Sequence, residues 1–546
     1  MEKIKYLIGI VITLLLFIPF LGYVHLFDWD EINFAECARE MVRSGHYHTV
    51  TIDYIPFWEK PPVFIWMQAL SMETFGVNEF AARFPNVLAG VFTLISLVYH
   101  GTKAQNDKLG WWWAAFYLGS FLPNLYFHSG IIDPWFNLFI FNSLAFYIFG
   151  IKDKRSIGFV CAGLFAGLAV LTKGPVALIL IGAPILIFHL VNRLQGIPKF
   201  KHLFLAFFTA IFIGLLWFIM LYVTGNKAVI QQFIDYQVRL FNTRDAGHGG
   251  PIYYHLLVLL LGCFPASFFA IGGLIRKNPK PQDLRRIMLI SGLFTLVLFS
   301  IVQTKIIHYS SLCYFPITFF AADFITHYKN RQNGIFFKIS IFYQFALAVV
   351  LGIFVYIQAF GGGIQKWVKI QDVFAAANLL AQERWSLLDF IPVLVWILGA
   401  VLAFVFFRRN QIKYAVNALL VSVALNMIVI KATTLQHIEA YSQRAAISFY
   451  QKKSKENVYI IPLGFKSYAH FFYGEVKPHP NQNRFNEQWI CGTDTDLKTF
   501  YVVRLPDKKF YLDTYPNLKL IYEKNGFVFL GQKKNLSLKP KIRTTP

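Results

Sequence analysis

Charged side chains that could carry out chemistry gather between Asp28 and Arg83, directly after the first apolar run of the sequence. The stretch opens with the carboxylates Asp30 and Glu31 and reaches Glu59 and Lys60 before two prolines. Packing does not require paired carboxylates, a lysine and an arginine in one segment beside an apolar run. Neighbouring carboxylates can deprotonate an acceptor hydroxyl or hold a cationic group. We therefore interpret this stretch as half of an active site.

A third carboxylate, Asp133, precedes Pro134 at the boundary of another apolar run. An uncompensated charge beside apolar residues is costly, which favours a functional role. Asp133 also fits the start of a helix with proline in its first turn, and both roles can hold together. Asp30 and Glu31 have the same alternative as solvated caps. We predict Asp30, Glu31 and Asp133 as the catalytic carboxylates.

Several basic side chains fall in connections on the same predicted face of the membrane. Such groups offset the charge that develops on a departing lipid-linked phosphate. Each could instead be a snorkelling residue at a helix end. The predicted phosphate-binding residues are Lys60, Arg83, Lys173, Arg239, Lys305 and His308.

Composition indicates a polytopic membrane protein. The chain has 546 residues, of which 56% are hydrophobic and only 15% are charged, which is too apolar for an ordinary soluble domain. The formal net charge of +23 comes mostly from short clusters of Lys and Arg between apolar runs, where positive residues set topology. We therefore predict membrane lipids and no nucleic acid as partners. The five cysteines show no metal-binding spacing.

Runs of about 20 apolar residues predict transmembrane helices. The Lys and Arg clusters alternate along these runs, which predicts a cytoplasmic N-terminus and puts every unusual polar motif on the opposite, outer face. About thirteen spans are predicted, at residues 4–27, 80–100, 109–128, 130–150, 157–172, 174–193, 201–223, 252–275, 285–302, 306–326, 335–358, 388–407 and 412–430.

The segments outside these runs have their own patterns. Residues 31–42 and 63–75 fit short helices lying in the membrane interface within the first outer loop. After residue 430 the apolar runs shorten and strand-like pieces appear. We predict a transmembrane domain at 1–430 and a small periplasmic α/β domain at 431–546, with strands near 458–461, 500–503, 518–522 and 526–530.

Short motifs follow one another in order along residues 5–325. They are Asp30-Glu31 with Phe34-Ala35-Glu36, Phe57-Trp58-Glu59-Lys60-Pro61-Pro62, Glu79-Phe80-Ala81-Ala82-Arg83, Asp133-Pro134, Leu171-Thr172-Lys173-Gly174-Pro175, Val238-Arg239 with Ala246-Gly247-His248, Gly262-Cys263-Phe264-Pro265 and Thr304-Lys305. This set resembles the aminoarabinose (4-amino-4-deoxy-L-arabinose) lipid A transferases and the wider protein mannosyltransferase-like family. These are GT-C glycosyltransferases that take a sugar from a polyprenyl phosphate.

The resemblance implies roles for individual residues. Asp30 and Asp133 match the family's key acidic positions, and Lys60, Arg239 and Lys305 match positions that handle the donor phosphate. Glu59 and His248 match a pair implicated in binding a divalent metal ion. The chain departs from the family pattern at Ile306-Ile307-His308-Tyr309, and its C-terminal domain matches no motif. The resemblance therefore does not identify the acceptor.

The sequence thus predicts an inverting hexosyl- or pentosyltransferase of the bacterial inner membrane, using a polyprenyl (undecaprenyl) phosphate sugar as donor. The acceptor is lipid A, another envelope glycolipid or a glycoprotein. For a hydroxyl acceptor, Asp30 is the favoured base and Asp133 the second. Alternatives are a protein O-mannosyltransferase-like or other glycan-modifying enzyme, a flippase of lipid-linked sugar, and a structural subunit. A flippase is disfavoured because its polar residues usually lie near mid-membrane.

Overall fold

The computed structural model describes residues 2–242, 249–276, 282–328, 334–492 and 495–533. The chain forms two compact units, which we describe separately. Unit 1 comprises residues 1–26, 37–353 and 387–434, and unit 2 comprises residues 27–36, 354–386 and 435–546. Helix α2, Asp30–Ser44, begins in unit 2 and ends in unit 1.

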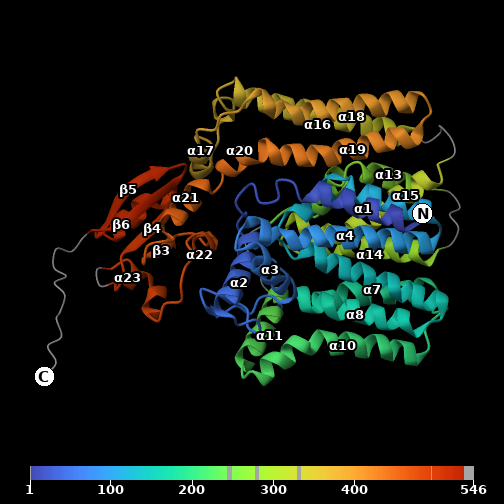
Figure 1. The fold of residues 1–546 in the computed structure, drawn as a ribbon, viewed down its shortest axis with the longest axis horizontal. Coiled ribbons are helices and arrows are strands. Elements are labelled where there is room, and N and C mark those ends of the chain that lie inside the picture. Colours follow the sequence, from blue (N-terminus) through green and yellow to red (C-terminus); the bar gives the residue numbers. More distant parts are fainter. Residues whose placement is uncertain (1, 243–248, 277–281, 329–333, 493–494, 534–546) are drawn as a thin grey trace. The chain divides into compact units, whose positions relative to one another are not determined.

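Unit 1 is built from helices whose long members lie side by side (Figure 1). A two-stranded hairpin, β1 (Thr51–Ile52) and β2 (Ile55–Pro56), lies in the first long connection. The other elements are α1 Glu2–Phe17, α3 Val63–Phe75, α4 Glu79–Ala104, α5 Asp107–Leu118, α6 Phe121–Leu125, η1 Tyr126–His128, α7 Asp133–Asp153, α8 Ser156–Lys173, α9 Val176–Val191, α10 Phe200–Val223, α11 Lys227–Asn242, α12 Tyr254–Gly262, α13 Ala266–Leu274, α14 Asp283–Ile301, η2 Ile307–Cys313, α15 Tyr314–Thr326, α16 Ile335–Ala359, η5 Leu387–Phe390, α18 Ile391–Arg408 and α19 Ile412–Ala432.

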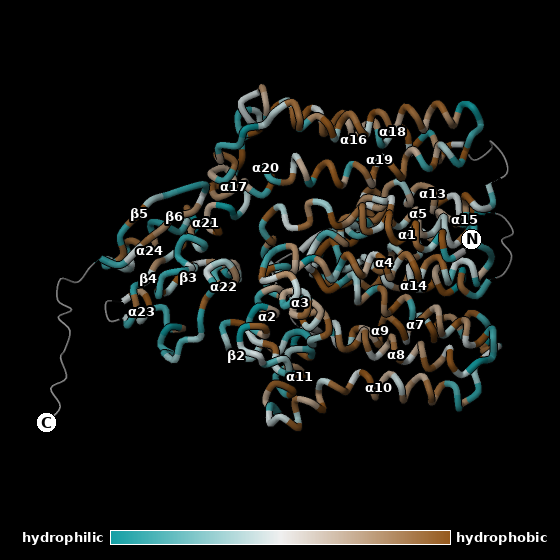
Figure 2. Tube along the Cα trace, in the orientation of Figure 1, coloured by the Kyte–Doolittle hydropathy of each residue, from teal (hydrophilic) through white to brown (hydrophobic). Residues whose placement is uncertain are grey.

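Many of these helices are apolar along their length, as their colours in Figure 2 show. Within the described residues, eight helices are long and apolar enough to cross a membrane, and a ninth span is formed if the bent pair α12 and α13 counts as one. Each of the thirteen predicted spans overlaps one or more of the helices above, but the count of thirteen crossings stays a prediction. The chain is a multi-pass membrane protein.

Two predicted spans are broken helices. The pair α12 and α13 bends by 107° before Pro265, because proline cannot donate a hydrogen bond within a helix. The predicted span 109–128 is divided into α5, α6 and η1. The two breaks contact each other, since Phe121 N–H donates to the Phe264 carbonyl at 2.9 Å and Ala266 N–H donates to Ser120 Oγ at 3.3 Å. Each break therefore satisfies backbone groups freed by the other.

Unit 2 contains a four-stranded sheet in the order β3-β4-β6-β5. The strands are β3 Tyr459–Leu463, β4 Thr499–Arg504, β5 Leu518–Lys524 and β6 Phe527–Gln532, and they overlap the four strand-like segments predicted from the sequence. The pair β3 and β4 is parallel, whereas β6 runs antiparallel to β4 and β5. Asn525 and Gly526 both have positive φ and form the two-residue turn between β5 and β6, as Asn-Gly sequences favour.

Helices and aromatic side chains complete unit 2. Phe449 packs on β6 through Phe529, with their ring centroids 4.7 Å apart, and Tyr501 and Val528 are fully buried in the sheet. The helical elements are η4 Ile364–Lys366, α17 Val373–Asn378, α20 Thr434–Ala440, α21 Arg444–Lys453, α22 Ala469–Tyr473, η6 Gln482–Phe485, α23 Glu487–Ile490, η7 Leu505–Asp507 and α24 Lys508–Thr514.

Candidate active site

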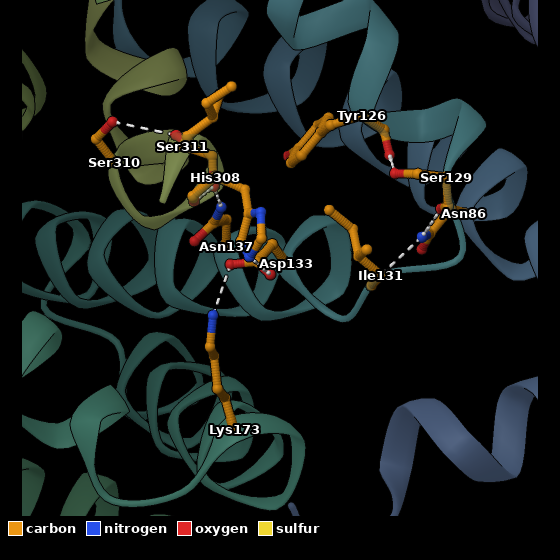
Figure 3. A network of polar contacts seen from close by, with 11 residues as sticks. Asn86, Tyr126, Ser129, Ile131, Asp133, Asn137, Lys173, His308, Ser310 and Ser311 are labelled. Carbon is orange, nitrogen blue, oxygen red and sulfur yellow. Dashed lines mark hydrogen bonds and ion pairs between the residues drawn. The ribbon is translucent and has the colours of Figure 1, made fainter. Parts of the chain in front are cut away.

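Asp133, Lys173 and His308 form a charged cluster in unit 1 (Figure 3). Lys173 Nζ donates to Asp133 Oδ1 at 2.7 Å, with side-chain exposures of 18% and 4%. His308 Nε2 lies 3.8 Å from the other carboxylate oxygen, Oδ2. The three residues come from the start of α7, the end of α8 and the start of η2. The sequence placed them on one face, and the fold brings their side chains together.

The backbone before Asp133 is held from α4. Asn86 Nδ2 donates to the carbonyls of Ser129 and Ile131 at 2.6 and 2.7 Å (Figure 3). Trp135 Nε1 donates to the Pro85 carbonyl at 3.0 Å. These contacts fix the entry into α7, so the direction of the Asp133 carboxylate is set by rigid neighbours.

Lys173 takes its position from the glycine that follows it. Gly174 has a φ of +90°, and a Cβ built there would lie 3.3 Å from the Phe233 ring of α11. Glycine tolerates this backbone conformation and close approach, whereas other residues do not without strain. Helix α8 can therefore end at Lys173 with α11 packed directly against its terminus.

The His308 segment is anchored through hydroxyl groups. Asn137 Nδ2 of α7 donates to Ser311 Oγ at 2.7 Å, and His255 Nδ1 pairs with Ser310 Oγ at 3.0 Å. Both serines are fully buried. The sequence motif following Lys305 thus forms a 3₁₀ helix fastened to α7 and α12, which holds His308 beside Asp133.

A second cluster surrounds Tyr236 of α11. Lys60 Nζ lies 5.4 Å from the centre of the Tyr236 ring, and the guanidinium of Arg239 lies 5.2 Å from it. Tyr236 OH also donates to Glu59 Oε2 at 3.4 Å. One buried aromatic ring thus holds two cations at a favourable distance for a cation–π contact.

The two clusters are linked through α11. Phe233, which packs against the end of α8 at Gly174, lies one helical turn before Tyr236 on the same face, because residues three apart are neighbours. Positive groups from α8, α11 and the segment before α3 therefore gather at one end of the bundle. Such an end can bind a phosphate and stabilise charge developing on it.

Two predicted phosphate-binding residues have their donors directed at backbone carbonyls. Arg83 is 3% exposed and donates to the carbonyls of residues 21, 24 and 25. Lys305 is 7% exposed, and its Nζ donates to the carbonyls of residues 299, 300 and 302 at the end of α14. These contacts favour a structural role in holding the segment after α1 and the end of α14, and phosphate binding by either residue stays a prediction.

Asp30 and Glu31 begin α2 in unit 2. Glu31 is 4% exposed, and its Oε2 accepts the Phe27 N–H at 2.7 Å. This contact satisfies a backbone donor of the chain that leads into α2. Because it is buried, Glu31 is not the solvated cap considered as the alternative, and the catalytic role of both carboxylates stays a prediction.

A metal centre was predicted at Glu59 and His248. His248 lies outside the described residues. Across the part of the chain that the structure describes, no three His, Cys, Asp or Glu side chains are grouped closely enough to hold a metal ion, and Glu59 contacts Tyr236. The described residues do not fit a metal site, and we derive no chemical step through one.

Sequence reasoning missed three residues that position the site: Tyr236, Asn86 and Asn137. Tyr236 lies three residues before Arg239 on an amphipathic helix, so a helical-wheel reading could have linked them. Asn86 and Asn137 are polar residues inside apolar helices, which is a signal for a buried hydrogen-bonding role.

One family model matches part of the chain. Residues 59–222 match the family described as dolichyl-phosphate-mannose-protein mannosyltransferase. This part of the chain is therefore similar to the protein mannosyltransferase-like family, which agrees with the resemblance of the sequence motifs.

Two individual proteins are similar to this chain over part of its length. An undecaprenyl phosphate-alpha-4-amino-4-deoxy-L-arabinose arabinosyl transferase of Shewanella sediminis is 28% identical over 347 residues, covering 61% of this chain and 63% of the relative. A protein of the same name from Photorhabdus laumondii is 27% identical, covering 55% of each chain. The matched region thus spans less than two thirds of either relative.

The fold agrees with a solved structure over nearly the whole chain. The structure of ArnT from Cupriavidus metallidurans bound to undecaprenyl phosphate matches with a TM-score of 0.77 at 18% identity, covering 96% of this chain and 97% of that one. At this identity the likeness establishes a shared fold.

Proposed function

We propose that this protein is an integral-membrane glycosyltransferase that moves a sugar from a polyprenyl phosphate, most simply undecaprenyl phosphate, to an envelope acceptor. The observation that carries the proposal is the pair of clusters at one end of unit 1, where Lys60 and Arg239 face Tyr236 and Lys173 is paired with Asp133. The relatives named as undecaprenyl phosphate-aminoarabinose transferases support the donor class.

In the proposed reaction an acceptor oxygen attacks the anomeric carbon of the donor sugar. The bond between that carbon and the phosphate oxygen breaks, and its electron pair leaves with the polyprenyl phosphate. Attack from the face opposite the leaving group inverts the anomeric centre. The phosphate gains one negative charge in this step, so cations positioned around it stabilise the transition state.

We propose that Lys60 and Arg239 bind the leaving phosphate. Both cations lie against the Tyr236 ring. Lys173 adjoins them through Gly174 and α11. Its ammonium is neutralised in part by Asp133, so we propose that Asp133 orients Lys173 and that His308 supports the pair. Asp30 is then the proposed base for a hydroxyl acceptor, with Glu31 holding the backbone that leads into α2. An anionic phosphate acceptor needs no base, and there Asp30 binds an amino group of the sugar.

The proposed acceptor is the phosphate of lipid A, as in aminoarabinose transfer, with another envelope glycolipid or a glycoprotein as the alternative. The proposed setting is the bacterial inner membrane, with the N-terminus cytoplasmic and the two clusters on the periplasmic face. The distribution of Lys and Arg supports this orientation.

Purified protein in nanodiscs tests the proposal with radiolabelled undecaprenyl phosphate sugars and a panel of lipid A, glycolipid and protein acceptors. We expect label transfer to one acceptor class and loss of transfer in Lys60→Met and Arg239→Met. Lys154→Met, at the exposed turn between α7 and α8, is the matched control and keeps full transfer.

The same preparations separate an enzyme from a flippase. Donor translocation across sealed vesicles without transfer to any acceptor contradicts the proposal. Full transfer by Asp30→Asn to a hydroxyl acceptor contradicts the base assignment alone, because an amide cannot accept the proton.

A further inference from the structure

Unit 2 contains a cavity of about 300 Å³ that lies outside the clusters described above. Its walls come from the start of the first long connection, from α17, from α21 and from the segments around β3 and β4. The residues that matter for its chemistry are Asp28, Asn378, Tyr450, Lys466 and Arg504. All of them belong to unit 2. The volume is at the lower end of the range for small-molecule sites.

Two residues that line this cavity each carry a buried polar atom with no hydrogen-bond partner among the described residues. Asn378 is 3% exposed and Tyr450 is 0% exposed, and both line the cavity. The unpartnered atoms are Asn378 Oδ1 and Tyr450 OH. Leaving such groups unpaired costs roughly 1–3 kcal/mol each, so a ligand or water that pairs with them is expected.

The side chain of Arg504 is positioned by two aromatic rings so that it can bind an oxyanion. Its guanidinium lies 5.0 Å from the Phe374 ring centre and 4.9 Å from that of Phe465. Contact with two rings limits the motion of the side chain, while the planar fork keeps its N–H groups available in the geometry that matches phosphate or carboxylate. A guanidinium fixed in this way loses less conformational entropy when it binds an anion.

The remaining groups favour a ligand that is both anionic and rich in hydroxyl groups. Lys466 adds a second cation, placed 4.6 Å from the centre of the Trp29 ring. Asp28 supplies a carboxylate, so the cavity carries two positive charges and one negative charge. Asn378 Oδ1 and the Asp28 carboxylate accept hydrogen bonds, as sugar hydroxyls can donate. Aromatic walls with a few placed polar groups are the usual lining of a ligand site.

We propose that this cavity binds the phosphate-bearing sugar unit of a phosphosugar, with Arg504 and Lys466 on the phosphate and Asn378, Asp28 and Tyr450 on the sugar hydroxyls. The inference does not rest on the proposed transferase activity. Asp28 lies two residues before Asp30, so an occupied cavity also fixes the chain entering α2.

The full-length protein in nanodiscs tests this binding by saturation-transfer NMR and calorimetry with glucose 1-phosphate, glucose and inorganic phosphate as probes. We expect glucose 1-phosphate to bind with a Kd of about 1 mM or below, and glucose and inorganic phosphate to bind about tenfold more weakly. Arg504→Gln should weaken glucose 1-phosphate about tenfold, since it removes a charge-assisted bidentate contact. Lys519→Gln, an exposed charge on β5 of the same sheet, is the matched control and should leave the Kd unchanged.

A second variant separates the sugar contacts from the phosphate contacts. Asn378→Leu should weaken glucose 1-phosphate and leave inorganic phosphate unchanged, because it removes an acceptor for a sugar hydroxyl and leaves both cations in place; it also removes the bond from Asn378 Nδ2 to the Phe374 carbonyl. Thermal unfolding of each variant checks that the protein remains folded, and Arg504→Lys should restore part of the affinity lost in Arg504→Gln.

The nanodisc composition distinguishes the two sources of a phosphosugar. If a glycosyl-phosphate lipid in the disc displaces free glucose 1-phosphate, the ligand is a lipid headgroup, and if it does not, the ligand is a soluble phosphosugar. Displacement by undecaprenyl phosphate, which has no sugar, assigns the binding to the candidate active site and overturns the proposal. Equal affinity for inorganic phosphate, or no binding of glucose 1-phosphate, also overturns it, and neither result bears on the transferase reaction.

Discussion

Replacing Lys173 with Met should destabilise the protein by leaving the Asp133 carboxylate buried without its ammonium partner. Asp133 is 4% exposed and its oxygen lies 2.7 Å from Lys173 Nζ. Breaking a buried ion pair from one side typically costs 3–5 kcal/mol. Lys173 is 18% exposed, which admits some water to the pair, so we expect the low end, about 3 kcal/mol.

The double variant tests whether this cost comes from the pair itself. Asp133→Asn combined with Lys173→Met removes both charges and leaves no uncompensated carboxylate. It should therefore be more stable than Lys173→Met alone, and the double-mutant cycle should give a coupling energy of about 2 kcal/mol. The third member of the cluster, His308 at 3.8 Å from Oδ2, remains in every variant and so cancels in the cycle.

Denaturant unfolding in a fixed detergent gives the four free energies, with Lys154→Met as a control at the other end of the α7–α8 pair. The control should match the parent, because its side chain is exposed. Equal stability of Lys173→Met and the double variant would refute the ion-pair argument. Full transfer activity in Lys173→Met would leave the ion pair intact as a structural feature and remove Lys173 from the proposed site.

Three further predictions follow from local geometry. Tyr236→Ala removes the ring that two cations contact, and at about 0.5–1 kcal/mol per contact it should raise the KM for the polyprenyl donor roughly tenfold. Tyr236→Phe keeps the ring, so its KM should stay near that of the parent. Equal donor kinetics for both variants would contradict the role of the ring. Gly174→Ala should lower the unfolding free energy by about 1–3 kcal/mol, because φ at this position is +90° and Phe233 is close. Gly182→Ala is the control, since a Cβ there meets nothing within 4 Å, and it should leave the unfolding free energy unchanged or raise it. Burial raises the pKa of Asp28 from 3.8 to about 6, so the folded protein holds this proton more tightly than the unfolded chain and loses stability as pH rises from about 4 to 6. Unfolding at several pH values should show that the stability difference between Asp28→Asn and the parent grows through that window and levels above it. A stability difference that does not change with pH would contradict the assignment.

Helix positions followed from the sequence because apolar runs and charge clusters report directly on what must be buried and what must meet water. The runs at 130–150 and 157–172 correspond to α7 and α8 within three residues at each end. The breaks at Phe264-Pro265 and Ser120 were invisible to hydropathy, because the residues on both sides are equally apolar. They depend on backbone groups of two segments pairing with each other, which no single run of sequence reveals.

The membership of the candidate site was more predictable than its internal pairing. Asp133, Lys173 and His308 were each singled out as polar residues at the predicted outer face, and they are found together. Arg83 and Lys305 were singled out for the same reason, yet both donate to backbone carbonyls, after α1 and at the end of α14. A basic residue next to a membrane helix can neutralise a phosphate or cap a helix end, and sequence alone does not distinguish the two because both need the same donor groups.

Helix ends explain why the clusters can exist in so apolar a bundle. Asp133 begins α7, Lys173 ends α8 and Arg239 lies in the last turn of α11. Charged groups near a helix end reach water or a headgroup without crossing the apolar interior, so their desolvation cost is smaller there than at the helix centre. Their separations are nevertheless set by helix packing, because each side chain is attached to a rigid element. We infer that the positions of Lys173 and Arg239 in the proposed phosphate site depend on contacts such as Gly174 against Phe233, and that substitutions in those contacts will change donor binding without touching a charged residue.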